Sequence, residues 1–154
     1  MSKDQTSVLS GTQLTWEGFD ILSTRISNAI RERKYQIDAI VGIARGGMFL
    51  AGALSYKLEI KNVFLVNTQL YSNRQRVNPR ILHAPKDIFF ENILVVDDIL
   101  DTGSTYYLIQ EFVRTISNNA IWTVLIDKGK SNIQVDFIGE RLHADFWIDF
   151  PWSR

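Results

Sequence analysis

The sequence contains no cysteine, only two histidines, and no apolar run near the roughly 18 residues that a membrane-spanning helix requires. The absence of cysteine excludes disulfide scaffolds, thiol nucleophiles and cysteine-type zinc sites, and it fits a reducing compartment. His83 and His143 have neither paired metal-ligand spacing nor catalytic-triad spacing. The N-terminal residues lack the apolar segment of a secretory signal, so we expect a cytoplasmic protein.

The chain also lacks an excess of charge of either sign. Lys and Arg together number 17, as do Asp and Glu, which gives a formal net charge of zero. No overall field therefore favours nucleic acid or a membrane surface, and we expect neither as a partner. The motifs of P-loop ATPases and of dinucleotide-binding enzymes are missing from the sequence, so any anion must be bound by another kind of local site.

What is present is the composition of a globular domain. The 154 residues are 45% hydrophobic and 12% aromatic, which is sufficient for one core without cross-links. Residues 1–13 are polar and rich in Ser and Thr, and we predict that they form a loose tail. Residues 14–154 are predicted to form a single domain.

The order of apolar patterns predicts an α/β fold. Apolar residues recur every three or four positions from Trp16 to Lys34, after Thr15 as a candidate N-cap, which is typical of an amphipathic helix. Further helical patterns cover Met48 to Leu58 and Thr105 to Ile116. Four nearly continuous apolar runs predict buried strands: Ile37 to Ile43, Val63 to Val66, Ile93 to Val96, and Ile121 to Ile126. Strands that are apolar on both faces and alternate with helices predict an open, mainly parallel sheet flanked by helices.

Two stretches depart from this alternation. Residues 67–92 are polar and unusually long for a connection, so they form either a surface excursion such as a β-hairpin or a mobile lid. Residues 143–152 are dense in aromatic side chains and form either a core edge or the wall of a pocket.

The segment from Ile93 to Thr105 carries the clearest chemical pattern. A buried strand runs into the adjacent carboxylates of Asp97 and Asp98, and a short turn rich in hydroxyl groups then opens a helix. Ligands of parallel sheets bind beyond the carboxyl ends of the strands. The amides at the start of a helix bind phosphate, and paired carboxylates suit vicinal hydroxyls or hydrated Mg²⁺. Together these groups predict a site for a ribose phosphate.

A second loop that can bind an anion follows the first predicted strand. Ala44, Arg45, Gly46 and Gly47 lie between a buried strand and a helix, where glycine lets backbone amides approach an anion closely and arginine adds a charged donor. The same residues in isolation would be an ordinary tight turn.

The acidic pair, followed by two apolar residues and Asp-Thr-Gly-Ser-Thr, resembles the phosphoribosyl-pyrophosphate signature of the type I phosphoribosyltransferases. The resemblance implies the fold of that family, with a small C-terminal hood over 129–154. Asp97 and Asp98 would then hold the ribose hydroxyls, directly or through Mg²⁺, and Asp101 would assist proton transfer at purine N7. The residues that would wrap the 5-phosphate are Asp101, Thr102, Gly103, Ser104 and Thr105, and those that would bind pyrophosphate are Ala44, Arg45, Gly46 and Gly47.

The resemblance extends to the long polar segment and to the C-terminus. Residues 67–92 resemble the flexible catalytic loop of the family, with Tyr71, Arg74 and Arg76 as candidate contacts. Lys128 resembles the lysine that 6-oxopurine enzymes direct at the purine O6 atom. In bacterial xanthine-guanine and archaeal purine enzymes, the residue that matches Trp147 stacks on the base, and the backbone around Ile148 and Asp149 would contact the purine 2-position.

By this resemblance, the protein uses Mg²⁺ to transfer the phosphoribosyl group from phosphoribosyl pyrophosphate to N9 of guanine, hypoxanthine or xanthine. The products would be pyrophosphate and a nucleoside 5'-monophosphate, in purine salvage, and relatives form homodimers or homotetramers. Two alternatives remain open at this point. One is a regulator that senses phosphoribosyl ligands and binds RNA, and the other is a phosphoribosyltransferase for another base.

Overall fold

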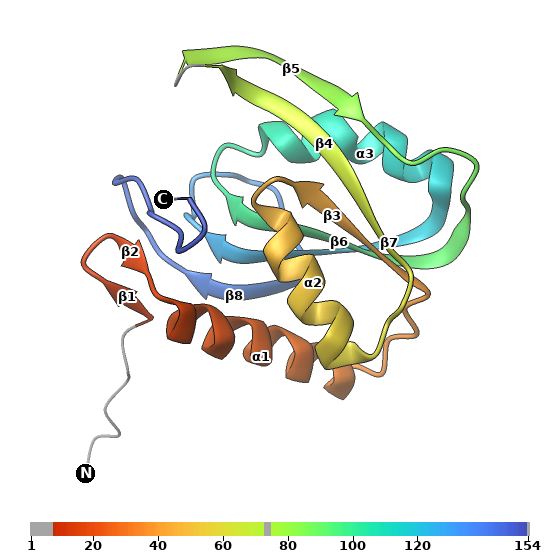
Figure 1. Ribbon diagram of the computed structural model, residues 1–154, viewed down its shortest axis with the longest axis horizontal. Helices are drawn as coiled ribbons and strands as arrows, with labels where there is room; N and C mark the ends of the chain where they lie inside the picture. Colours follow the sequence, from red (N-terminus) through yellow and green to blue (C-terminus); the bar gives the residue numbers. More distant parts are fainter. Residues whose placement is uncertain (1–7, 73–74, 154) are drawn as a thin grey trace.

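The computed structural model describes residues 8–72 and 75–153, with no account of the side chains of residues 71–77 (Figure 1). Its elements, in chain order, are β1 (Leu9–Ser10), β2 (Gln13–Leu14), α1 (Trp16–Glu32), β3 (Ala39–Ala44), α2 (Gly47–Leu58), β4 (Val63–Ser72), β5 (Gln75–His83), β6 (Phe90–Leu100), α3 (Ser104–Ile116), β7 (Ser117–Asp127) and β8 (Phe137–Arg141). Within the described part of the chain, no helix is long and apolar enough to cross a membrane.

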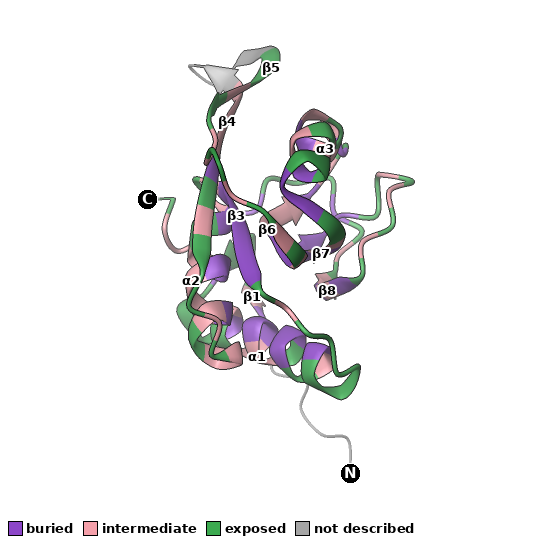
Figure 2. Ribbon diagram, turned by 90° about the vertical axis from the view of Figure 1, so that its right-hand side faces the viewer, coloured by how far each residue is buried: buried purple, intermediate pink, exposed green. Residues whose placement is uncertain are grey.

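The central sheet has the strand order β5-β4-β3-β6-β7-β8. Every neighbouring pair is parallel except β4 and β5, which are antiparallel. Helices α1 and α2 pack on one face of this sheet and α3 covers the other, as the side view in Figure 2 shows. The predicted α/β architecture, an open and mainly parallel sheet flanked by helices, is confirmed.

The continuous apolar runs of the sequence follow from this layering. In β6, Leu94 and Val96 belong to the core under α1 and α2, whereas Ile93 and Val95 belong to the core under α3. Successive side chains of a strand point to opposite faces, so a strand covered on both faces must be apolar at every position.

Helix α1 follows the predicted pattern closely. The Thr15 hydroxyl oxygen accepts a hydrogen bond of 2.9 Å from the Gly18 amide, which confirms Thr15 as the N-cap. Leu22, Ile26 and Ile30 are buried against the sheet. The helix ends at Glu32, two residues before the predicted Lys34.

The predicted loose tail over 1–13 is too long. Residues 9–14 form the β1–β2 hairpin, which the C-terminal segment holds in place through two backbone hydrogen bonds. The Leu14 amide donates to the Asp149 carbonyl oxygen, and the Asp149 amide donates to the Thr12 carbonyl oxygen. Val8 is buried beside this hairpin, whereas residues 1–7 lie outside the described residues. The hairpin was not predicted because its sequence is polar and the segment that holds it, around Asp149, is far away in the sequence.

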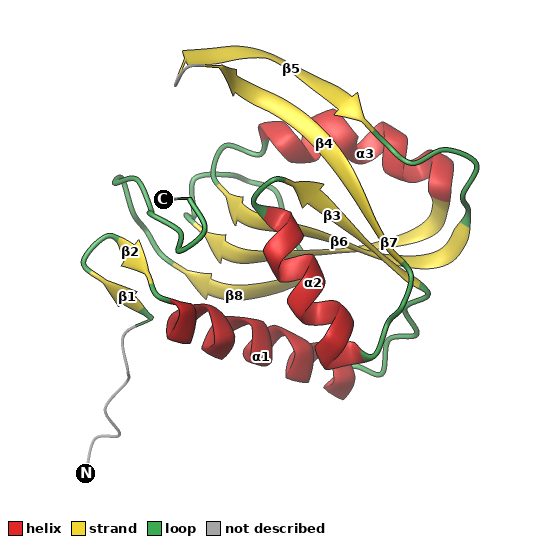
Figure 3. Ribbon diagram, in the orientation of Figure 1, coloured by secondary structure: helices red, strands yellow, loops and turns green. Residues whose placement is uncertain are grey.

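The polar stretch 67–92 is mostly strand rather than irregular loop. Its residues up to His83 pair as the antiparallel β4–β5 hairpin, with Asn67 opposite His83 and Ser72 opposite Gln75. Figure 3 shows this hairpin extending the sheet beyond β3. The sequence left open a surface excursion such as a β-hairpin and a mobile lid, and the observed conformation is the β-hairpin. It lacks apolar alternation because it lies at the edge of the sheet, where the outer positions face solvent.

The segment predicted as a hood, 129–154, also contains part of the main sheet. Strand β8 (Phe137–Arg141) pairs in parallel with β7 and packs against α1. Only the residues of this segment outside β8 remain available to cover a site. The strand escaped prediction because Gly139, Glu140 and Arg141 break its apolar pattern, as an edge position permits.

Candidate active site

A cavity of about 660 Å³ opens at the carboxyl ends of β3, β6 and β7. Its size lies within the range of ligand sites, and its place is the one where α/β sheets bind their ligands. Segments far apart in the sequence line it, and the lining includes Arg45, Gly46, Asp97, Asp98, Asp101, Thr102, Gly103, Ser104, Thr105, Lys128, Trp147 and Ile148. The structure therefore brings together residues of four predicted groups: the acidic pair, the hydroxyl-rich turn, the arginine-glycine loop and the C-terminal wall.

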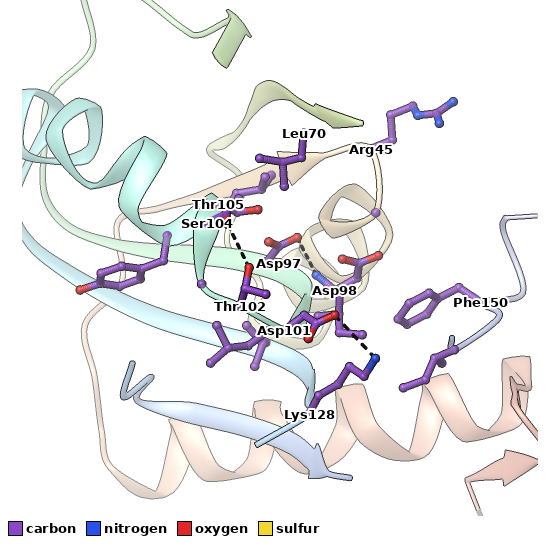
Figure 4. A pocket seen from close by; sticks show the side chains of 18 of the residues that line it. Arg45, Leu70, Asp97, Asp98, Asp101, Thr102, Ser104, Thr105, Lys128 and Phe150 are labelled. Carbon is purple, nitrogen blue, oxygen red and sulfur yellow. Dashed lines mark hydrogen bonds and ion pairs between the residues drawn. The ribbon is translucent and has the colours of Figure 1, made fainter. Parts of the chain in front are cut away.

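Asp97 and Asp98 occupy the floor of the cavity near the end of β6 (Figure 4). The Asp98 amide donates a 2.9 Å hydrogen bond to Asp97 Oδ1. Burial raises the pKa of the Asp97 carboxyl well above its ordinary value, and the neighbouring Asp98 carboxylate adds to this rise. Burial also raises the pKa of Asp98. Two neighbouring carboxylates with little solvent around them are stabilised when a proton or a cation lies between them and a ligand.

The pair fits a magnesium ion that a substrate helps to hold. Mg²⁺ prefers oxygen ligands and is usually bound by one or two carboxylates together with water and phosphate oxygens. The described residues contain no group of three or more His, Cys, Asp or Glu side chains placed to form a metal cage of protein ligands alone. Asp97 and Asp98 are the residues that would hold the ion.

The turn after β6 presents its polar groups to the same cavity. Gly103 has a φ of +85°, a conformation that residues with a Cβ rarely adopt, and it reverses the chain before α3 begins at Ser104. The Thr102 and Ser104 hydroxyl oxygens lie 2.9 Å apart (Figure 4). Amides at the start of a helix point toward a ligand and carry the positive end of the helix dipole, so this turn is suited to a phosphate group.

The loop between β3 and α2 faces this turn across the acidic pair. Arg45 and Gly46 line the cavity, the Ala44–Arg45 peptide bond is cis, and the Arg45 guanidinium points away from Asp97 and Asp98 (Figure 4). A Cβ on Gly46 would lie 2.8 Å from Asp98 Oδ1 and closer still to its other carboxyl atoms. Glycine is therefore needed at position 46 so that the loop can pass close to the Asp98 carboxylate.

A second cavity of about 460 Å³ adjoins the first at this loop. Ala44 and Arg45 line it together with residues 67–70 at the base of the β4–β5 hairpin. Gly47, which the sequence placed among the anion-binding candidates, does not line either cavity. It lies against the Val96 carbonyl oxygen and lets α2 pack closely on β6.

Lys128 follows β7 and is nearly buried, with 6% of its side chain exposed. Its ammonium nitrogen donates a 3.0 Å hydrogen bond to the Phe146 carbonyl oxygen and lies 3.6 Å from Asp101 Oδ2 (Figure 4). Asp101 itself is 43% exposed toward the cavity. A cationic donor and an anionic acceptor thus lie side by side at the cavity wall.

The aromatic C-terminus forms one wall of the cavity, although not with all of the predicted residues. Trp147 lines it with 72% of its surface exposed, and Ile148 lines it while almost fully buried. Asp149 does not line the cavity, because its backbone groups are bound to the β1–β2 hairpin. Its carboxylate also accepts a 3.4 Å hydrogen bond from the Thr12 hydroxyl.

Several lining residues had no signal in the sequence. Trp152 belongs to the aromatic stretch 143–152 but was not singled out; it lines the cavity, and its ring stacks on those of Phe49 and Phe150, with ring centroids 4.5 and 4.9 Å away. Phe49 lies in a helix that is apolar at most positions, so periodicity does not distinguish it from a core residue. Other lining residues that the sequence did not indicate are Met48, Leu70, Tyr106, Trp122, Thr123, Val124 and Val135.

The predicted contacts of the polar segment lie near the tip of the β4–β5 hairpin. Tyr71 and Arg76 are opposite one another in the register of its two strands. Arg74 lies outside the described residues, and the side chains of Tyr71 and Arg76 do too.

Comparison with known proteins gives a consistent set of relatives. The family described as the phosphoribosyl transferase domain matches residues 12–153. A xanthine-guanine phosphoribosyltransferase of Cereibacter sphaeroides is 32% identical over 118 residues, covering 75% of this chain and 68% of that protein. A protein of the same name from a Ruegeria species is 30% identical over 155 residues, covering 89% and 86%. The crystal structure of a purine phosphoribosyltransferase from Pyrococcus horikoshii superposes with a TM-score of 0.79 at 28% identity, covering 92% of this chain and 93% of that one.

Proposed function

This chain belongs to the phosphoribosyl transferase domain family, and on that premise we propose that it transfers the phosphoribosyl group of phosphoribosyl pyrophosphate to a 6-oxopurine. The acceptor is guanine, hypoxanthine or xanthine, and the products are a nucleoside 5'-monophosphate and pyrophosphate, as in purine salvage. The xanthine-guanine phosphoribosyltransferases among its relatives support this acceptor class.

The observation that carries the acceptor class is the 3.6 Å separation of the Lys128 ammonium and the Asp101 carboxylate. In a 6-oxopurine, O6 and N7 are neighbouring atoms on one edge of the base. Lys128 donates to O6 while Asp101 holds and moves the proton at N7. Adenine carries an amino group at the 6-position, which would leave the lysine facing another donor, and such a mismatch at a buried polar group is strongly rejected.

The remaining lining groups are proposed to hold the donor substrate. Asp97 and Asp98 hold the ribose hydroxyls and Mg²⁺, and residues 102–105 surround the 5-phosphate with hydroxyls and helix amides. Mg²⁺ held by these two carboxylates would supply positive charge that offsets the charge of pyrophosphate. The backbone of residues 44–46 and the second cavity beside it receive that pyrophosphate. Most of the catalytic effect is then positioning and electrostatic stabilisation.

Water exclusion is the proposed role of the β4–β5 hairpin and of the C-terminal wall. Trp147 stacks on the purine and Ile148 packs beside it. Leu70, in strand β4, lines both cavities. Tyr71 and Arg76, which lie opposite one another in the hairpin, are proposed to contact the pyrophosphate when the hairpin approaches, and so is Arg74, which lies outside the described residues. A closed site protects a cationic sugar transition state from hydrolysis.

We also propose a cytoplasmic homodimer or homotetramer. Large exposed apolar side chains support the assembly, because they gain from burial against another copy. The most exposed on the helices are Tyr56 at 88% and Tyr107 at 61%. The absence of cysteine from the chain fits a reducing compartment. Light scattering of the purified protein would give twice or four times the 17.7 kDa chain mass, and a monomer would contradict the assembly.

Pyrophosphate release tests the proposed reaction. The purified chain is incubated with Mg²⁺ and phosphoribosyl pyrophosphate, with guanine, hypoxanthine, xanthine, adenine, orotate or uracil added in turn, and with a control that lacks base. Release that depends on a 6-oxopurine supports the proposal. Release with adenine, orotate or uracil alone would refute the acceptor class. Binding of phosphoribosyl pyrophosphate without release for any base would refute the enzyme in favour of a phosphoribosyl-sensing regulator.

A further inference from the structure

Asp127, the residue before Lys128, forms an ion pair outside the two cavities, in which its carboxylate is buried and the Arg141 side chain is 56% exposed. Asp127 and Arg141 are a register pair at the carboxyl ends of the parallel strands β7 and β8. Arg141 directs two donors at one oxygen of the Asp127 carboxylate, with Nε 2.9 Å and Nη2 2.8 Å from Oδ2. Only 3% of the Asp127 side chain is exposed, and neither residue lines a cavity.

The other oxygen of the same carboxylate holds the turn that contains Lys128. Asp127 Oδ1 accepts a 2.8 Å hydrogen bond from the Gly129 amide, two residues along the chain. One carboxylate therefore bridges β8, through Arg141, to the residue that follows Lys128. Ionised carboxylates accept the strongest hydrogen bonds of protein side chains, so this bridge fixes the local path of the chain.

Backbone hydrogen bonds hold the same turn from both sides. The Lys128 amide donates to the Leu100 carbonyl oxygen at 3.0 Å, which ties the turn to the end of β6. The Leu142 amide donates to the Asp127 carbonyl oxygen at 2.8 Å, which ties it to the end of β8. The Lys128 backbone is thus fixed relative to the strand that carries Asp97 and Asp98.

We infer that the Asp127–Arg141 ion pair positions Lys128 and thereby sets the preference for a 6-oxo over a 6-amino base. This inference rests on the proposed function. A lysine side chain has a flexible four-carbon stem, so its ammonium keeps one direction only if its backbone and its end are both held. The Phe146 carbonyl oxygen holds the end, and the ion pair holds the backbone.

Removal of either partner is expected to loosen the turn. Without Arg141, the buried Asp127 carboxylate would lose both guanidinium donors and keep the Gly129 amide, and a buried carboxylate without its cation is costly. Water or a rearranged turn would then satisfy it, and Lys128 would move. Without the Asp127 carboxylate, Gly129 and β8 lose their common acceptor.

The test compares Arg141→Gln, Asp127→Asn and the double variant, which leaves no unpaired charge and keeps the experiment valid if a single variant does not fold. The matched control is Glu140→Gln. Glu140 precedes Arg141 in β8 but pairs with Arg25 of α1, so its loss removes an ion pair of the same strand away from Lys128. For each protein, kcat/KM is measured with the preferred 6-oxopurine and with adenine, and the Kd of phosphoribosyl pyrophosphate is measured without base.

The three variants are expected to lose about ten- to a hundredfold in kcat/KM for the 6-oxopurine, the effect of misplacing a substrate contact by up to about 1 Å. The preference over adenine should fall with it, while the Kd of phosphoribosyl pyrophosphate and the control variant stay as in the wild type. Equal losses for both bases, or no loss, would overturn the inference.

Crystal structures of the same variants give a readout independent of activity. The inference requires that the Lys128 ammonium leaves the Phe146 carbonyl oxygen in Arg141→Gln and stays there in Glu140→Gln. An unmoved Lys128 in all variants would overturn the inference even if the wild type is active. A wild type that is inactive with every base would instead refute the proposed function, and the position of Lys128 would still decide whether the ion pair holds it.

Discussion

Gly46→Ala is expected to lower activity strongly while changing the free energy of unfolding little. Gly46 lies at the start of α2 with φ −59° and ψ −45°, which alanine adopts without strain. An added Cβ would lie 2.8 Å from Asp98 Oδ1 and closer to Oδ2, whereas ordinary contacts of a Cβ begin at 3.4 Å. The methyl group therefore forces the carboxylate of Asp98 out of its place on the cavity floor.

The size of the effect follows from that displacement. The carboxylate must move by on the order of 1 Å, and a misplacement of that size costs about a hundredfold in rate. A hundredfold loss in kcat/KM corresponds to about 2.7 kcal/mol of transition-state stabilisation. The free energy of unfolding should change by no more than about 1 kcal/mol, because alanine restricts the unfolded chain and the short Asp98 side chain can rotate.

Pyrophosphate release and urea unfolding of the same samples measure the two quantities. Gly52→Ala is the matched control, because Gly52 lies in the same helix and a Cβ added there would meet no other atom within 4 Å. The control should gain about 0.5–1 kcal/mol in stability and keep the kcat/KM of the wild type. Wild-type kcat/KM in Gly46→Ala would refute the argument, and so would a loss of activity that merely follows unfolding.

Three further predictions follow from the site. Asp101→Asn should lower kcat by about 10²- to 10⁴-fold with an unchanged Kd for phosphoribosyl pyrophosphate, and equal losses in both would contradict its proton-transfer role. Burial raises the pKa of Asp97 above its ordinary 3.8, so the folded state binds that proton more tightly and stability falls as pH rises from 3.8 through the raised pKa. Asp97→Asn should reduce this fall in metal-free buffer and leave the part that comes from the raised pKa of Asp98, and superimposable stability curves against pH would contradict the assignment. Trp152→Ala should lower the free energy of unfolding by about 2–4 kcal/mol, because the Trp152 ring stacks on those of Phe49 and Phe150. If the variant unfolds at the same urea concentration as the wild type, the stack does not stabilise the C-terminus.

The helices and the central strands could be predicted because their signals are local. The period of α1 and the two-faced apolar strands β3 and β6 follow from backbone geometry, which repeats every 3.6 or 2 residues. Strand β8 was not predicted, and β5 was indicated only as part of one of two alternatives, because these strands form the two edges of the sheet. An edge strand can be polar, so its conformation depends on the neighbour that pairs with it.

The same distinction applies to the cavity. The acidic pair and the hydroxyl-rich turn are contiguous in residues 93–105, so one strand, one turn and one helix bring their groups together, and the sequence was sufficient to predict them. The approach of Asp101 to Lys128 required the pairing of β6 with β7, in which Leu100 lies opposite Asp127. Asp149 lies outside the cavity lining for the same reason, since its backbone partners come from the N-terminal hairpin.

The sequence by itself determined the layered α/β architecture and the contiguous loop proposed to bind the ribose phosphate, because both depend on the chemistry of neighbouring residues. Only the tertiary structure decided the burial of Asp97 and Asp98, the aromatic stack of Trp152 and the ion pair of Asp127 with Arg141. Each of these depends on how segments far apart in the sequence pack together. That packing is set by the burial of the whole core, and no local pattern records it.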